Sequence, residues 1–287
     1  MNHIAKWKPE EATNLLNSQT ILITSKVALS LAFLFYASWS DYKTREVGNR
    51  VWAVYAPIAL VLSLAELLLY DSAKLPFFGL SFGLTAVFAL ILFYTGGFGG
   101  ADSKALMCIG LALPFSTENL FTPLIPSGIS PLSLNIFPLT IFTNSILFAA
   151  ASGLYMLLRN LIQRASTGKK LFEGTLSAES IGKKILVMIT GYKFPIAKLK
   201  EKWHVYPMED INDDGENPTK RKLVVVPRDE GRDEIVERLS KAVDDGKISD
   251  RVWATPGLPM LIFVTLGLIV ALVFGDLVWI LVSLLLG

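Results

Sequence analysis

The sequence predicts an α-helical polytopic membrane protein with six transmembrane helices and a small soluble α+β domain inserted before the last helix. Three observations support this fold class. The 287-residue chain is 52% hydrophobic and has a mean hydropathy of +0.48, which is too apolar for an ordinary soluble domain. Its apolar residues fall into separate long runs. Most of its charged residues lie in one block between the fifth and the last of these runs.

The apolar runs set the predicted helices, since a spanning helix needs about 20 mostly apolar residues. The fourth run reaches only about half of the hydrocarbon thickness at 1.5 Å per residue. We expect the chain to continue its crossing beyond Pro114. Residues 21–158 would then hold helices one to five. The runs are Ile21–Trp39, Val51–Tyr70, Phe77–Thr95, Ala105–Pro114, Ile136–Leu158 and Leu258–Leu286.

Polar segments flank these runs. Residues 1–20 are predicted to form an interfacial arm, with Trp7 at the level of the lipid headgroups. The first run holds one charge, Lys26, which is expected to snorkel outward. Glu66, late in the second run, is interpreted as an interfacial residue.

The charged block at residues 159–253 is predicted to be a soluble domain. His204–Met208 and Leu223–Pro227 have the composition of short strands. Arg232–Val243 has apolar residues at helical spacing. The basic segment Arg159–Lys170 is expected to lie against anionic lipid. Residues 254–287 would then form the sixth transmembrane helix.

The distribution of Lys and Arg predicts the orientation. If all six runs cross, the loops after the first and third runs and the charged block share one side of the membrane. That side carries Lys43, Arg45, Arg50, Lys104 and the Arg159–Lys170 cluster. The positive-inside rule places it in the cytoplasm and both termini outside.

Two carboxylates at run ends are the candidate functional residues. Asp41 ends the first run, and Asp102 lies in the glycine-rich stretch Gly96–Lys104. A carboxylate near a bilayer is costly unless it is paired or solvated, so it marks a functional site by default. Two aspartates at one depth would share a proton, and such a pair can perform aspartic-protease chemistry. The glycines would let a second chain approach Asp102 closely.

Each aspartate also has a purely structural interpretation. Asp102 is suited to cap the following helix. Asp41 would be neutralised by Lys43 or Arg45. The chemical interpretation rests on both carboxylates lying on the same side, one of them beside a glycine cluster.

Composition argues against other classes of function. The single cysteine, Cys108, allows no intrachain disulfide and no cysteine-based zinc site. The two histidines, His3 and His204, are not spaced with the aspartates. We therefore expect no metal and no cofactor. The net charge of +2 does not suggest nucleic-acid binding.

With these residues identified, the chain resembles the archaeal preflagellin peptidases. These are GxGD-type membrane aspartyl proteases related to type IV prepilin peptidases. Ser38–Asn49 resembles the segment of the first aspartate, and Gly99–Lys104 resembles the GxGDxK segment. The resemblance implies that Asp41 and Asp102 are the catalytic pair and that Gly99 and Gly100 are motif glycines. Ala101 stands where the family has its second glycine.

The resemblance also implies an activity. The substrate would be a preflagellin or a related type IV prepilin-like precursor, which loses a short basic leader at the cytoplasmic membrane face. Methyltransferase activity is not expected, because Cys108 alone cannot supply the paired-cysteine zinc segment of bifunctional relatives. Two alternatives stay open: a cation or proton-coupled transporter that uses both aspartates, and a non-catalytic assembly component. The oligomeric state is not predicted.

Overall fold

The computed structural model describes residues 9–286 except 118–119, 121, 169, 212–219 and 226–230, with side chains from Ser18 onward. The chain forms two compact units. One comprises Met1–Phe148 and Pro259–Gly287, and the other comprises Ala149–Leu258. Of the predicted interfacial arm, residues 1–8 lie outside the described residues, and the first helix begins at Pro9.

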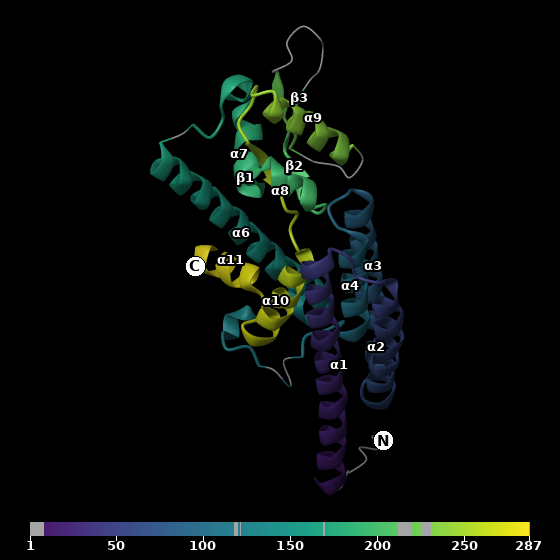
Figure 1. Ribbon diagram of the computed structural model, residues 1–287. Coiled ribbons are helices and arrows are strands. Elements are labelled where there is room, and N and C mark those ends of the chain that lie inside the picture. Colours follow the sequence, from purple (N-terminus) through teal and green to yellow (C-terminus); the bar gives the residue numbers. More distant parts are fainter. Residues whose placement is uncertain are drawn as a thin grey trace. The chain divides into compact units, whose positions relative to one another are not determined.

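The first unit is built from helices (Figure 1). α4 packs against α1, α2 and α3, and α1 also packs against α10. Two 3₁₀ turns and the short helix α5 connect the longer elements. The bounds are α1 Pro9–Thr44, α2 Asn49–Tyr70, η1 Ser72–Lys74, α3 Leu75–Tyr94, α4 Gly100–Ala112, η2 Pro126–Gly128, α5 Pro131–Asn135, α6 Phe137–Thr167, α10 Met260–Val273 and α11 Leu277–Leu286.

Four helices are long and apolar enough to cross a membrane. They span Ser18–Thr44, Asn49–Tyr70, Ser72–Tyr94 and Phe137–Thr167. The bent pair of α10 and α11 is a fifth candidate. Within the described residues the chain therefore has four or five candidate spans, and the predicted total of six is not confirmed. The difference arises at α4, whose 13 residues are too few to cross unaided.

The last apolar run is also not one straight helix, because α10 and α11 meet at 61°. Gly275 at the break has φ +85°, which favours glycine. Asp276 then caps α11, since its Oδ1 accepts the Trp279 N–H at 3.0 Å and its Oδ2 accepts the Ser130 hydroxyl at 2.7 Å. The Asn144 amide donates to the Gly275 carbonyl at 2.9 Å. The break is thus stabilised by hydrogen bonds from other elements.

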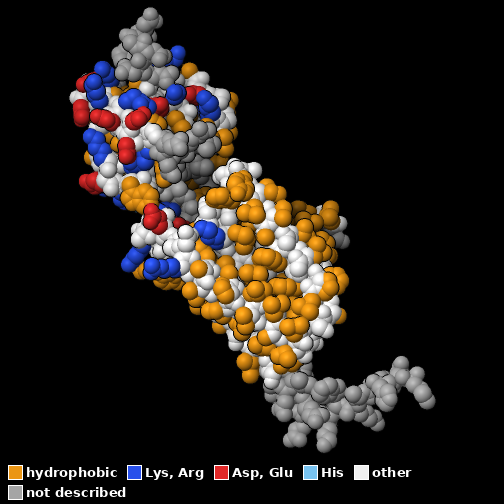
Figure 2. Space-filling view, turned by 90° about the vertical axis from the view of Figure 1, so that its right-hand side faces the viewer, with side chains coloured by type: hydrophobic (Ala, Val, Ile, Leu, Met, Phe, Trp, Pro, Cys, Tyr) orange, Lys and Arg blue, Asp and Glu red, His pale blue; other side chains and the backbone are white. Residues whose placement is uncertain are grey.

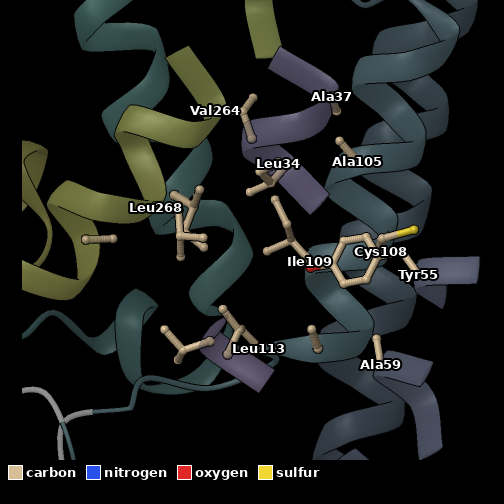
Figure 3. Close-up of a cluster of buried hydrophobic side chains, with 14 of the residues drawn as sticks. Leu34, Ala37, Tyr55, Ala59, Ala105, Cys108, Ile109, Leu113, Val264 and Leu268 are labelled. Atoms are coloured by element: carbon tan, nitrogen blue, oxygen red, sulfur yellow. The ribbon is translucent and has the colours of Figure 1, made fainter. Parts of the chain in front are cut away.

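Apolar side chains from α1, α2, α4 and α10 form the main core of this unit. Figure 3 shows Leu34, Ile109 and Leu268 between their helices, with Tyr55 of α2 beside α4. Many hydrophobic side chains are also exposed on the outside of the unit, and they cover most of the face that Figure 2 shows. Apolar residues on both the inner and the outer faces are what a helix bundle in lipid requires.

The charge in the first span is buried in this unit, contrary to the prediction. Lys26 does not snorkel but pairs with Glu66 of α2, and their side chains are only 6% and 15% exposed. Glu66 is therefore not a free interfacial residue. The pair joins α1 to α2 inside an apolar bundle, where each charge compensates the other.

The second unit is α+β. A three-stranded antiparallel sheet has the order β1-β5-β2, and β3 pairs with β4 in a second sheet. Tyr192 lies opposite Ala254, and Tyr206 lies opposite Thr255. The bounds are η3 Gly174–Ala178, α7 Ile181–Thr190, β1 Tyr192–Pro195, α8 Ile196–Glu201, β2 Tyr206–Pro207, β3 Glu209–Ile211, β4 Arg221–Leu223, α9 Arg232–Asp244 and β5 Arg251–Thr255.

The predicted helix at Arg232–Val243 is confirmed by α9. The predicted strand at His204–Met208 contains β2. The strand predicted from Leu223 instead ends there, as the last residue of β4, and residues 226–227 of that prediction lie outside the described part of the chain.

Buried polar groups connect the two sheets. The fully buried Glu209 of β3 accepts the Trp253 N–H of β5 at 2.6 Å and the Arg221 guanidinium of β4 at 3.2 Å. Asn160 of α6 donates to the carbonyls of Met188 and Gly191 at 2.9 and 2.8 Å. These bonds fix the end of α7 on α6, so the last turns of a candidate span are part of this unit.

Candidate active site

Asp41 lies in the last turn of α1, and a tight turn follows it. The Arg45 N–H donates to the Asp41 carbonyl at 3.0 Å, and Arg45 has a left-handed φ of 57°. The hydroxyls of Ser40 and Thr44 both donate to the Glu46 carbonyl, at 2.7 and 3.0 Å. The helix end that carries Asp41 is therefore closed by its own side chains.

The Asp41 carboxylate is half-buried and has no hydrogen bond or ion pair among the described residues. Lys43 does not neutralise it, because the Lys43 ammonium lies 4.4 Å from the centre of the Trp39 ring. Arg45 is near enough to act on Asp41 electrostatically but forms no ion pair with it in the described part of the chain. The ion pair with Lys43 or Arg45 that a purely structural role of Asp41 would require is therefore absent from the described residues.

Asp102 is the third residue of α4. Its Oδ2 accepts the Gly99 N–H at 3.0 Å, so it caps the helix from inside the first turn rather than from the N-cap position. No other hydrogen bond reaches this carboxylate within the described residues, which leaves Oδ1 without a partner. Asp102 can therefore cap the helix with one carboxylate oxygen and still offer the other to a substrate or a water molecule.

The glycines before Asp102 have different local roles. Gly96 has φ +75° and ends α3, and the N–H groups of Gly97 and Phe98 both return to the Leu92 carbonyl, at 2.8 and 3.0 Å. A Cβ at Gly99 would lie 3.1 Å from Oδ2 of Asp102. A side chain at this position would therefore displace the Asp102 carboxylate.

Gly100 and Ala101 have less restrictive surroundings. A Cβ at Gly100 would meet only Phe93 Cε2, at 3.6 Å. Ala101 lies in the first turn of α4 and has no positive φ. The departure from the family glycine therefore needs no torsion that alanine lacks.

The two aspartate-bearing segments approach each other. Lys104, two residues after Asp102, donates from Nζ to Oδ1 of Asn49 at 2.7 Å, and Asn49 begins the helix that follows the Asp41 turn. Burial raises the pKa of Asp102 to about 7, the Gly99 N–H opposes this shift, and the charge of Asp41 adds to it. The structure thus brings both predicted carboxylates within electrostatic reach of each other.

The bond between Lys104 and Asn49 was not predicted from the sequence, although both residues lie in the motif segments. Ser103 was also not singled out. It is buried beside Asp102, and its hydroxyl has no hydrogen-bond partner among the described residues. The lysine two residues after Asp102 was the signal in the sequence for this bond, but its partner could not be predicted because it depends on how α2 packs against α4.

Within the described residues, no group of three or more His, Cys, Asp or Glu could hold a metal.

Comparisons with known proteins agree with this arrangement. Residues 28–157 match the model of the type IV leader peptidase family, and residues 183–277 match the model described as archaeal peptidase A24 C-terminus type II. Together the two matches cover most of the chain.

Three curated relatives are all called preflagellin peptidase. That of Methanococcus voltae is 28% identical over 87% of this chain and 94% of its own length. Those of Methanococcus maripaludis and Methanocaldococcus jannaschii are 25% and 24% identical, each over 85% of this chain and over 92% and 91% of their own lengths. The resemblance drawn from the sequence is therefore confirmed: the chain is similar to the type IV leader peptidase family over residues 28–157 and to preflagellin peptidases over most of its length.

Proposed function

We propose that this protein is a membrane aspartic endopeptidase that removes the short basic leader from preflagellin or a type IV prepilin-like precursor. Asp41 and Asp102 are its catalytic pair, and Gly99, Gly100 and Ala101 line the approach of the substrate. The observation that carries the proposal is that the two aspartate-bearing segments meet at the bond between Lys104 and Asn49, and that the charge of Asp41 helps to raise the pKa of Asp102. The names of the relatives support the substrate class.

The chemistry follows from one proton shared by two carboxylates. Like charges in close proximity do not both ionise easily, so one member of the pair keeps its proton. Asp102, with a pKa of about 7, is the member that holds it near neutral pH. The ionised Asp41 then takes a proton from water, and the protonated Asp102 polarises the scissile carbonyl.

We place this reaction at the cytoplasmic face of the cell membrane, with the soluble domain on the same side and both termini outside. This orientation requires the chain to complete a crossing through α4 and the segment beyond Pro114, as expected from the sequence. Lys43, Arg45, Arg50 and Lys104 flank the aspartates, as the positive-inside rule requires of a cytoplasmic face. A substrate whose basic leader precedes an apolar helix would present its junction at this level. Lipid surrounds the helical unit, whose outer face is apolar (Figure 2).

The activity is peptidase without methyl transfer, and it needs no cofactor. The single cysteine, Cys108, is buried in the core between α1, α2 and α4. A paired-cysteine zinc segment has no counterpart in this sequence.

The test uses Asp41→Asn and Asp102→Asn in isolated membranes with a preflagellin substrate. Asparagine keeps the shape and removes the acid, so each variant should accumulate normally and release no leader. Asp71→Asn is the matched control, because Asp71 is partly exposed and, among the described residues, its ion-pair partner is Lys74. Cleavage by either catalytic variant would refute the proposal. Ion flux through liposomes without proteolysis would support the transporter instead.

A further inference from the structure

A groove with basic walls lies in the unit Ala149–Leu258, outside the candidate active site. It is formed by the last turns of α6, the segment that follows α6, and α7, and its volume is about 360 Å³. We call it the α6–α7 groove. Its residues used below are Leu161, Arg164, Lys170, Lys184, Ile185 and Met188.

Three cations and no carboxylate line the α6–α7 groove. Arg164, Lys170 and Lys184 form no ion pair with any described residue. The Lys184 ammonium donates to the Ser177 carbonyl at 2.6 Å and lies 5.9 Å from the centre of the Phe172 ring, so it is held at the groove. The lining of the groove therefore has a net positive charge, and within the described residues no ion pair neutralises it.

The carboxylate on which the charge of Lys184 acts, Glu179, is already bonded to other groups. Glu179 accepts the Leu223 N–H at 2.9 Å and the Lys183 ammonium at 2.9 Å. These bonds and the neighbouring lysines lower its pKa, so it stays ionised and paired. It lies outside the lining of the groove.

The remaining walls are apolar and partly exposed. Leu161 is 41% exposed and Ile185 is 45% exposed, and Ile181, which also lines the groove, is 76% exposed. Exposed aliphatic side chains directly beside free cations match a ligand with an anionic head and an apolar tail. A soluble anion would gain nothing from these side chains.

The position of the groove relative to the membrane surface follows from α6 alone. The candidate span Phe137–Thr167 includes Leu161 and Arg164, so these residues end a helix that can cross the membrane. Basic residues at such an end lie at the level of the phosphate groups of the lipid.

We propose that the α6–α7 groove binds one anionic phospholipid. Its phosphate lies among Arg164, Lys170 and Lys184, and the start of an acyl chain lies on Leu161, Ile185 and Met188. A neighbouring cavity of similar volume, about 360 Å³, contains the carboxylates of Glu173 and Asp250 and does not share this charge pattern. The site is independent of the proposed peptidase activity.

Native mass spectrometry of the full-length protein in mild detergent tests the site. The protein is titrated with dioleoyl-phosphatidylglycerol or with dioleoyl-phosphatidylcholine, which has the same chains and no net charge. We expect one retained phosphatidylglycerol, bound about tenfold more tightly than phosphatidylcholine. The triple variant Arg164→Gln/Lys170→Gln/Lys184→Gln should lose this preference. The double variant Arg164→Gln/Lys170→Gln keeps the Lys184 contacts and should lose most of it.

The matched control removes the same charge elsewhere in the unit. Lys198, Lys200 and Lys241 are exposed on α8 and α9, and their triple glutamine variant should bind phosphatidylglycerol as the wild type does. Equal binding of both lipids by the wild type would overturn the proposal, as would equal loss in the control variant. Displacement of phosphatidylglycerol by excess inorganic phosphate would show a simple anion site and would overturn it too.

Discussion

Gly99 is the residue where a single methyl group tests the geometry of the candidate site most directly. In Gly99→Ala the new Cβ would lie 3.1 Å from Asp102 Oδ2, so the carboxylate must move by a few tenths of an ångström. The same oxygen accepts the Gly99 N–H at 3.0 Å. Gly100→Ala is the matched control, because its Cβ would meet Phe93 at an ordinary 3.6 Å.

The magnitude follows from that hydrogen bond. A hydrogen bond to a charged group contributes about 1.5–3 kcal/mol, and weakening it by half removes about 1 kcal/mol. The Gly99 N–H lowers the pKa of Asp102, so its partial loss raises that pKa above 7 by roughly half a unit to one unit. Displacement of a catalytic group by a fraction of an ångström costs several-fold in rate, since about 1 Å costs roughly 100-fold.

The assay is leader cleavage in isolated membranes between about pH 5 and about pH 9. This range brackets the pKa of Asp102, which belongs to a coupled carboxylate pair. In the proposed mechanism Asp102 acts in its protonated form, so activity should fall as the pH rises through its pKa of about 7. In Gly99→Ala this alkaline decline should move upward and the maximal rate should fall. Gly100→Ala should keep the wild-type profile. Identical profiles for the two variants would refute the assigned contact between Gly99 and the carboxylate.

Three further predictions concern the same helical unit. Burial raises the pKa of Asp102 from its ordinary 3.8 to about 7, so the folded state loses stability as the pH rises through 7 and the buried carboxyl ionises. In thermal unfolding at about pH 8, Asp102→Asn should therefore be more stable than the wild type by on the order of a few kcal/mol. This gain should vanish toward about pH 4, where Asp102 is protonated in the folded protein. Lys104→Met removes the bond to Asn49 and should lower kcat with little change in KM, whereas Lys104→Arg should retain part of the rate. Glu66→Ala leaves the Lys26 ammonium buried and should destabilise the protein by about 3–5 kcal/mol, and the double change Lys26→Met/Glu66→Leu should restore most of that loss in the same unfolding assay.

Helix positions in this protein follow from local sequence, and for that reason most were predictable. The apolar runs at Val51–Tyr70 and Phe77–Thr95 match α2 and α3 closely, and the spacing in Arg232–Val243 matches α9. Hydropathy does not reveal a break inside an apolar run. The bend between α10 and α11 depends on Gly275 and on the capping of α11 by Asp276, and hydrogen bonds from distant elements complete it.

Contacts between helices were not predictable, because they depend on register. Lys26 and Glu66 are 40 positions apart, and nothing local shows that α1 and α2 align them. The same holds for Lys104 and Asn49, 55 positions apart. The two aspartates could be selected because each lies beside an apolar run, which is a local property.

The way each acid of the helical unit is satisfied separates structural from chemical roles. Glu66 is paired with Lys26, and both oxygens of Asp276 accept hydrogen bonds at the start of α11. Asp102 has one oxygen engaged and one without a partner in the described part of the chain. Asp41 has no bonded partner there at all, although it lies in the last turn of a helix, where the backbone dipole disfavours negative charge. A half-buried carboxylate without a hydrogen-bond partner costs stability. Such unsatisfied polar groups are typical of catalytic and other functional sites. In the proposed mechanism, Asp102 is therefore the acid that a backbone hydrogen bond holds in place, and Asp41 is the acid that has no bond among the described residues to give up when it binds the attacking water.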